Sequence, residues 1–140
     1  MVYLTREEHF NAAHKLSIAE WSFEENKAVF GKCANHNFHG HNFLVKVTVK
    51  GEPDPRTGFS MNVTDLSKIM KEFIVERFDH KNLNLDVADF KEKQPTCENL
   101  AMVIWNLIEP QISERTQGNA QLHQVRIYES PRMYVDYFGK

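Results

Sequence analysis

Large apolar residues occupy every second position of the range Phe43–Lys50, at Phe43, Val45, Val47 and Val49. Because residues two apart point to the same side of an extended chain, this pattern predicts a strand with one buried face. Residues 2–14 alternate in a similar way, although Glu8 interrupts the apolar side. Residues 122–129 and 134–138 predict two more strands on either side of a Ser-Pro-Arg turn.

Between the second and third of these strands, the apolar residues recur every three or four positions. The stripe from Leu66 to Phe78 predicts an amphipathic helix, with Thr64 or Asp65 near its N-terminal cap. A second stripe runs from Leu100 to Ile112, behind a start signal at Pro95-Thr96. The two stripes therefore predict two helices that each bury one face.

Two connections have patterns of their own. The long segment 15–37 contains Ser22-Phe23-Glu24-Glu25, a capping box that predicts a short helix ending at Gly31. Residues 52–58 contain two prolines and a glycine and predict a turn. After this turn, residues 59–62 are expected to pair back as a strand.

The order strand, strand, helix, helix, strand, strand predicts an α+β fold, with a four-stranded antiparallel sheet and two helices on one face. Residues 1–140 are expected to form a single domain, because a chain of this length can bury a hydrophobic core without disulfide bonds or structural metal ions. The other face of the sheet is also expected to carry Val and Phe side chains, so a single subunit would leave an apolar surface exposed to solvent. We therefore expect self-association.

Composition narrows the classes of function. The 17 basic and 19 acidic residues give a net charge of -2, which does not indicate a nucleic-acid or membrane surface. No apolar run approaches the roughly 20 residues of a membrane span, and the charged start lacks the apolar segment of a secretory signal. Two cysteines are too few for a disulfide framework, so a reducing, cytoplasmic compartment is expected.

The motif that says most about chemistry is His39-Gly40-His41, directly before the alternating range. Residues two apart in an extended chain can aim two imidazoles at one point. A catalytic zinc uses three protein ligands and keeps an open position. His14, on the same side of its segment as Phe10, is the candidate third ligand, and His36 is a rival that spacing alone does not exclude.

Four further residues are considered for catalytic roles. Cys33 lies in the polar loop before the histidine pair, where a nearby cation would favour its thiolate. Cys97, in the first turn of a helix, has no histidine beside it and is expected to be structural. Asp79-His80 follows the first long helix. An aspartate can orient a histidine for acid-base work, although a helix cap explains the pair equally well.

Acidic and hydroxyl side chains suggest a binding role. Glu129 ends an apolar strand, and a buried carboxylate needs partners. It can accept two parallel hydrogen bonds from a guanine- or pterin-type ring, or form a salt bridge at the strand end. Thr96 and Glu98 invite similar roles, but helix capping and favourable charge at a helix N-terminus explain them adequately.

Together these features resemble the 6-pyruvoyl-tetrahydropterin synthase family, which has the tunnelling fold. The resemblance extends from about Phe10 to Tyr137 and rests on several segments in the family's order. These segments are Phe10-Asn11-Ala12-Ala13-His14, Phe30-Gly31-Lys32-Cys33, His39-Gly40-His41-Asn42, Asp65-Leu66, Asp79-His80-Lys81-Asn82-Leu83-Asn84, Pro95-Thr96-Cys97-Glu98-Asn99 and Val125-Arg126-Ile127-Tyr128-Glu129.

The resemblance implies roles for the residues already singled out. The implied zinc ligands are His14, His39 and His41. The implied catalytic residues are Cys33 as the base, working with Asp79 and His80, and Glu129 as the pterin anchor.

The resemblance also implies a reaction and an assembly. The reaction converts 7,8-dihydroneopterin triphosphate into 6-pyruvoyl-tetrahydropterin and triphosphate, in tetrahydrobiopterin biosynthesis. Mg²⁺ is associated with it in addition to Zn²⁺. Family members form homohexamers of two stacked trimers whose sheets close into barrels, with each active site built by neighbouring subunits.

Three positions depart from the family's pattern, and two alternatives stay open. Glu8 replaces a commonly apolar residue. His36 and Phe38 stand where the family commonly has Pro and Gly, and Phe38 is expected to crowd the approach to His39. The nearest alternative activity is that of 6-carboxy-tetrahydropterin synthase, but the five residues between Cys33 and His39 resemble the pyruvoyl enzyme. A third relative that cleaves the side chain usually has Glu in place of this cysteine. From another class, a non-catalytic zinc- or pterin-binding module is the alternative.

Overall fold

Two long neighbouring strands form the centre of the sheet. In the computed structural model, which describes residues 1–140, β1 (Val2–His14) and β2 (His39–Gly51) pair antiparallel along their whole lengths. The register places His14 opposite His39 and Phe10 opposite Phe43, without a bulge. The side-chain alternation predicted from the sequence therefore continues unbroken through both strands.

Three further strands complete the sheet, in the order β3-β1-β2-β4-β5. β4 (Ala120–Ser130) and β5 (Met133–Tyr137) are antiparallel to their neighbours, as predicted. β3 (Lys81–Asn82) pairs parallel with β1, so the prediction of four purely antiparallel strands is wrong. A strand of two residues is too short to show an alternating pattern in the sequence.

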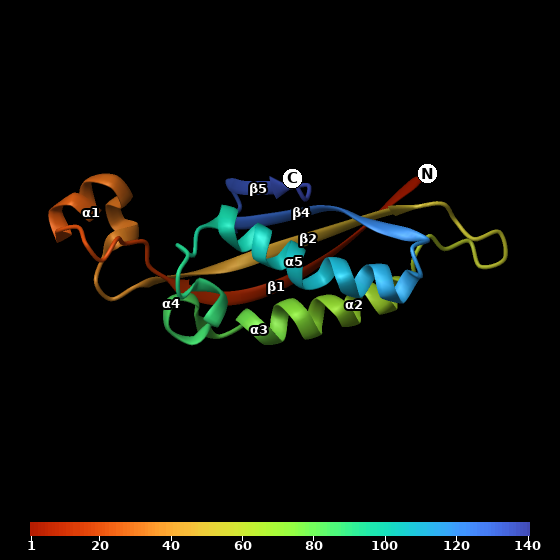
Figure 1. The fold of residues 1–140 in the computed structure, drawn as a ribbon, viewed down its shortest axis with the longest axis horizontal. Coiled ribbons are helices and arrows are strands. Elements are labelled where there is room, and N and C mark those ends of the chain that lie inside the picture. The colour runs from red at the N-terminus through yellow and green to blue at the C-terminus, as the bar shows by residue number, and fades with distance from the viewer.

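Two long helical segments lie side by side on one face of the sheet (Figure 1). The first consists of α2 (Val63–Met70), the π-helical turn η2 (Lys71–Val75) and α3 (Glu76–Phe78), and the second is α5 (Cys97–Thr116). Thr96 caps α5 as predicted. Thr64 and Asp65 lie in the first turn of α2, near its N-terminal cap as predicted, and the cap itself is Asn62, whose side chain accepts the hydrogen bond from Thr64 N.

The hydrophobic core fills the space between these helices and the sheet. Side chains with no exposed surface come from the inner side of the sheet and from the apolar stripes of both helices. They include Phe43, Val45, Val47, Leu66, Met70, Ile74, Leu100, Ile104, Ile108, Ile112, Val125 and Ile127. No helix combines the length and the apolar composition that crossing a membrane requires.

The sheet face away from the helices is mostly polar, which corrects the prediction of Val and Phe positions there. Thr5 and Thr48 hydrogen-bond across the strands at 2.8 Å. Arg126 binds Asp136 through two nitrogen–oxygen contacts of 2.6 and 2.8 Å, and its guanidinium lies 3.9 Å from the ring centre of Tyr134. The Val and Phe positions of β2 all point toward the helices, so this face carries cross-strand polar pairs instead.

Opposite ends of the sheet carry two different extensions (Figure 1). Beyond His14 and His39 project α1 (Phe23–Phe30) and the short 3-10 helix η1 (Gly31–Ala34). Ser22 caps α1 in the predicted capping box, and Gly31 ends it with a φ of 57°. On the way to α5, the chain also forms α4 (Leu83–Asp86) and the short 3-10 helix η3 (Ala88–Phe90).

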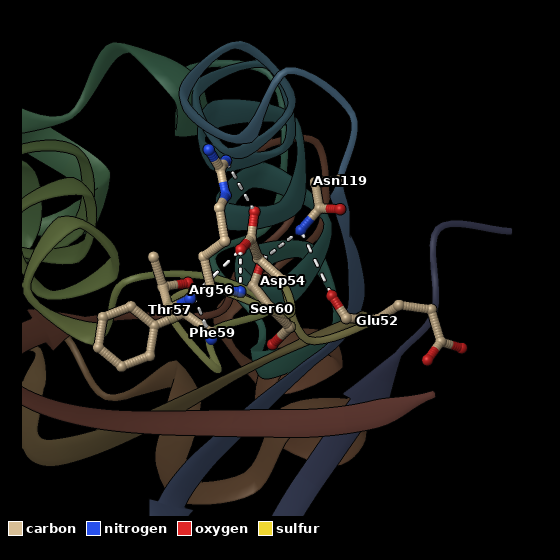
Figure 2. A network of polar contacts seen from close by, with 7 residues as sticks. All are labelled: Glu52, Asp54, Arg56, Thr57, Phe59, Ser60 and Asn119. Carbon is tan, nitrogen blue, oxygen red and sulfur yellow. Dashed lines mark hydrogen bonds and ion pairs between the residues drawn. The ribbon is translucent and has the colours of Figure 1, made fainter.

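The loop after β2, at the other end of the sheet, confirms the predicted turn but not the predicted strand over residues 59–62. The carboxylate of Asp54 accepts hydrogen bonds from Arg56 N and Thr57 N, which closes the turn (Figure 2). The side-chain amide of Asn119 donates to the carbonyl of Ser60 at 3.1 Å and to that of Glu52 at 3.5 Å. A side chain thus binds backbone carbonyls that a strand would have paired in a ladder.

We expect Asp136→Asn to lower the free energy of unfolding by about 0.5–1 kcal/mol at pH 7, a value kept small because the pair is partly solvated. The Arg126 guanidinium lowers the pKa of Asp136 from its usual 3.8, so the ion pair stabilises the fold above that pH. Its contribution is lost as the pH falls below 3.8. Urea unfolding at pH 7 and at about pH 3 measures the difference, with the exposed Glu20→Gln as control. An equal effect of Asp136→Asn at both pH values would contradict this account.

Candidate metal centre

Three imidazoles meet at one end of the β1–β2 ladder. His14 is the last residue of β1 and lies opposite His39, the first residue of β2. His41 follows two residues later on the same side of the strand. The ring centres are 4.6 Å apart for His14 and His39, 5.1 Å for His14 and His41, and 4.9 Å for His39 and His41. The structure thus brings together the three residues that the sequence singled out as ligands.

Several ring nitrogens of this cluster lack hydrogen-bond partners. His14 is 1 % exposed, and its Nδ1 donates to the Pro95 carbonyl at 2.7 Å, which leaves Nε2 with a free lone pair. His14 Nε2, both nitrogens of His39, and His41 Nε2 are buried without partners. Buried polar atoms are nearly always paired, so several unpaired nitrogens side by side are the arrangement expected of metal ligands.

Burial keeps these imidazoles in the form that binds metal. It lowers the pKa of His14, His39 and His41 below the usual 6.5, and neighbouring imidazoles lower it further. At neutral pH the rings are therefore uncharged, and their nitrogens can donate electron pairs to a cation. The Pro95 carbonyl fixes the ring orientation and tautomer of His14, a role that sequence reasoning missed. Only the fold places residue 95 beside residue 14.

Glu129 completes the cluster from a third strand. One oxygen of its carboxylate lies 3.0 Å from His41 Nε2, and the ligand atoms of these four side chains all lie within 4.8 Å of one another. Sequence reasoning proposed Glu129 as a ring anchor but did not place it beside the histidines. The spacing of two residues could have placed it, because Glu129 lies on the same core-facing side of β4 as Val125 and Ile127.

Cys33 lies near the cluster but outside this group of four. It belongs to η1, and its carbonyl accepts a 2.8 Å hydrogen bond from Leu16 N, two residues beyond His14. Burial, followed by the negative charge of Glu129, raises the pKa of Cys33. The protein's own groups therefore favour the thiol, and the expected thiolate requires a positive charge from elsewhere. Burial raises the pKa of Cys97 to about 12, which agrees with a structural role for that residue.

Asp79 and His80 form the expected pair at the edge of the sheet. His80 Nδ1 lies 2.8 Å from Asp79 Oδ2, while Asp79 Oδ1 accepts a hydrogen bond from Asn11 N. The hydrogen bond from Asn11 N, and next that from His80, lower the pKa of Asp79. The side chain of His80 is 84 % exposed, so one chain alone does not bring this pair into the histidine cluster.

Thr96 and Glu98 have the capping roles considered from the sequence. Thr96 Oγ1 accepts a hydrogen bond from Asn99 N at 3.2 Å, and Glu98 is exposed in the first turn of α5. Within a single chain, neither side chain belongs to the group of four that holds the histidines.

Comparison with known proteins decides the family. The sequence model of the family described as 6-pyruvoyl tetrahydropterin synthase matches residues 3–140. The chain belongs to this family. A 6-pyruvoyl tetrahydrobiopterin synthase of Drosophila melanogaster is 42 % identical over 139 residues, which cover 99 % of this chain and 80 % of the relative. The resemblance stated from sequence motifs, and with it the expectation of an enzyme of this family, is therefore confirmed.

The fold agrees with that of a solved family member. The 6-pyruvoyl tetrahydropterin synthase of Caenorhabditis elegans matches with a TM-score of 0.90 at 37 % identity, covering 99 % of this chain and 96 % of the other. A 6-carboxy-5,6,7,8-tetrahydropterin synthase of Bacillus subtilis is more distant, at 26 % identity over 98 % of this chain and 85 % of the relative.

The departures from the family's pattern at His36 and Phe38 leave the histidine cluster intact. The His36 ring stacks on Phe23 with centres 4.6 Å apart and is not part of the cluster, so the structure does not support His36 as a rival ligand. Phe38 has a φ of 65°, a left-handed conformation that costs about 1–2 kcal/mol for a residue other than glycine. Its ring lies beneath the ammonium of Lys15, while His39 still faces the other imidazoles.

We expect His39→Ala to abolish zinc binding that survives dialysis, because it removes one of three imidazoles from a cluster of neutral donors. The matched control is His36→Ala, which removes a histidine three residues away that stacks on Phe23. Metal content measured by inductively coupled plasma mass spectrometry should fall from about one zinc per chain to near zero only in His39→Ala. Equal zinc in both variants would show that His39 is not a ligand.

Proposed function

We propose that this protein is a cytoplasmic, zinc-dependent 6-pyruvoyl-tetrahydropterin synthase. It would convert 7,8-dihydroneopterin triphosphate into 6-pyruvoyl-tetrahydropterin and triphosphate, in tetrahydrobiopterin biosynthesis. The observation that carries the proposal is the set of unpaired imidazole nitrogens beside the Glu129 carboxylate. This set stands in a chain of the matching family, in which residues 1–140 would form one domain.

The donor set fits zinc. Neutral imidazoles with a carboxylate nearby are common zinc ligands, and in this proposal His14, His39 and His41 hold the ion. When bound, zinc would polarise oxygen atoms of the substrate side chain and acidify the adjacent C–H bond. Mg²⁺ remains an expectation carried over from the family.

The chain's own residues would move the protons. Cys33 would take the proton from carbon as a thiolate, which its raised pKa permits only beside a positive charge. His80, oriented by Asp79, would return a proton to another atom of the substrate. Triphosphate leaves during the rearrangement, and reduction of the ring is balanced by oxidation of the side chain. No nicotinamide is therefore needed.

Glu129 would recognise the pterin ring. Its two carboxylate oxygens can accept the N–H and NH₂ hydrogens that such a ring presents side by side. Thr96 and Glu98, at the start of α5, are proposed as further contacts to the substrate. The peptide between Pro95 and Thr96 already touches the cluster through the Pro95 carbonyl.

We also propose a homohexamer of two stacked trimers, in which the sheets close into barrels. Two features of the single chain support assembly. Its sheet is open, with β3 and β5 at the edges, and the polar face of the sheet has no covering layer. The Asp79–His80 pair faces solvent, as expected if it completes the site of a neighbouring subunit.

The product identifies the activity. We expect the purified, zinc-loaded protein to release triphosphate from 7,8-dihydroneopterin triphosphate and to form a product with the mass of 6-pyruvoyl-tetrahydropterin. The mass of 6-carboxy-tetrahydropterin would instead assign the activity of the Bacillus subtilis relative. Zinc-loaded protein that releases no triphosphate would support the non-catalytic binding module.

We expect Cys33→Ala to keep zinc and fold while losing turnover by roughly 100-fold or more, since a positioned base contributes about 10²–10⁴. Cys97→Ala is the matched control, because it removes the other thiol from a buried position outside the proposed chemistry. Steady-state turnover, zinc content and circular dichroism are compared. Near-normal turnover of Cys33→Ala would reject this residue as the base.

A further inference from the structure

Residues 16–33 form a loop that projects beyond the end of the β1–β2 ladder and contains α1 (Figure 1). We call this segment the Cys33 loop, because Cys33 is its last residue. Its two ends are joined by a backbone hydrogen bond, in which Leu16 N donates to the Cys33 carbonyl at 2.8 Å. Since Leu16 lies two residues after His14, this bond connects Cys33 to the strand that carries a candidate metal ligand.

The Cys33 loop has no hydrophobic core of its own. None of its residues belongs to the core between the helices and the sheet, and its large apolar side chains Trp21, Phe23 and Val29 are exposed. Asn26 is the single buried residue of the loop, with 6 % of its surface exposed. Because little apolar surface is buried here, the polar contacts of the loop decide its shape.

Asn26, in α1, binds both backbone groups of Ile18. Its Oδ1 accepts a hydrogen bond from Ile18 N at 2.7 Å, and its Nδ2 donates to the Ile18 carbonyl at 3.0 Å. Nδ2 also donates to the Ser22 carbonyl at 3.1 Å. A carboxamide offers a donor and an acceptor side by side, so Asn26 pairs with Ile18 much as a neighbouring strand would. The side chain thus ties α1 to the segment that follows His14.

A second carboxamide holds the neighbouring residue. Gln94 Nε2 donates to the Ser17 carbonyl at 2.6 Å, and Ser17 N donates to Gln94 Oε1 at 3.2 Å. Gln94 directly precedes Pro95, whose carbonyl binds His14. Residues 17 and 18 are therefore attached through Gln94 to the support of the metal centre, and through Asn26 to α1.

We propose that Asn26 is a positioning residue that places the Cys33 thiol beside the metal centre. The inference rests on the proposed function, in which Cys33 removes a proton from the substrate. α1 ends at Phe30 and η1 begins at Gly31, so no linker separates the helix that holds Asn26 from the turn that holds Cys33. Misplacing a reacting group by about 1 Å can cost about 100-fold in rate, so an anchor remote from the thiol can decide turnover.

The first test is Asn26→Ala, which removes the carboxamide and leaves the backbone groups of Ile18 to water. We expect unchanged zinc content, because no proposed ligand is altered. The kcat for triphosphate release should fall roughly 10–100-fold, as expected for a displaced base. KM should stay close to the wild-type value, since the base acts in the chemical step and not in binding.

Ser22→Ala is the matched control. It removes the side-chain cap of α1, which accepts a hydrogen bond from Glu25 N, but none of the contacts between Asn26 and Ile18. This variant should weaken the same helix and still keep kcat near that of the wild type. The comparison separates the position of Cys33 from the stability of α1.

Two further readouts do not depend on catalysis. In the metal-free protein, iodoacetamide should label Cys33 several-fold faster in Asn26→Ala than in the wild type or Ser22→Ala, because a thiol that leaves a partly buried position ionises more readily. Peptide mass spectrometry separates this label from that on the buried Cys97. Hydrogen exchange of the wild type, resolved to single residues, should show the amides of Leu16 and Ile18 protected relative to that of the exposed Glu20.

Unchanged kcat and labelling in Asn26→Ala would overturn the inference. An equal loss of kcat in Ser22→Ala would also overturn it, because the effect would then belong to helix stability. If Asn26→Ala does not fold, the wild type still decides, since rapid exchange at Leu16 and Ile18 would reject the anchor. A wild-type protein that forms no product would reject the proposed function, whereas the labelling rates would still show whether Asn26 places Cys33.

Discussion

The uninterrupted pairing of β1 with β2 is the constraint on which the site depends. Register in an antiparallel pair determines which side chains are neighbours, and a slip of one residue would send His39 and His41 to the opposite face. The buried positions of both strands hold that register, because Phe10 and Phe43 stack within the core. Core packing and metal-site geometry are thus two consequences of the same ladder.

Burial then sets the chemistry of the convergent side chains. The same desolvation that lowers the pKa of the three histidines raises that of Cys33. Neutral imidazoles are ready to bind a cation, whereas a neutral thiol is not ready to act as a base. The protein alone is therefore electrostatically incomplete, with one carboxylate and several unpaired nitrogens at its centre. A divalent ion held by the cluster would supply the positive charge that both features require.

The rest of the fold supports the histidine cluster in three ways. The helices cover one sheet face and exclude water from the side of the sheet that carries the cluster. Pro95, just before the N-cap of α5, contributes the carbonyl that orients His14. The end of β4 contributes Glu129 to the cluster from outside the β1–β2 pair. The Asp79–His80 pair lies at the sheet edge, with the His80 side chain open to solvent.

Local patterns in the sequence were sufficient for the long elements and for the metal motif. Strand alternation, helical stripes and the capping box depend on neighbouring residues, so strands β1, β2, β4 and β5, two helical segments and the α1 cap were predictable. The His39-Gly40-His41 spacing and the parity of His14 identified three ligand candidates for the same reason. The family's segments, read together, identified the family.

Only the tertiary structure decided what depends on residues distant in sequence. The parallel pairing of β3 with β1 and the side-chain bonds of Asn119 join residues that are distant in sequence. The polar outer face, the stacking of His36 on Phe23 and the approach of Glu129 to His41 depend on which segments pack together. A sequence determines the donors that a chain carries. The convergence and burial of those donors, which decide their charge and their partners, arise only when the chain has folded.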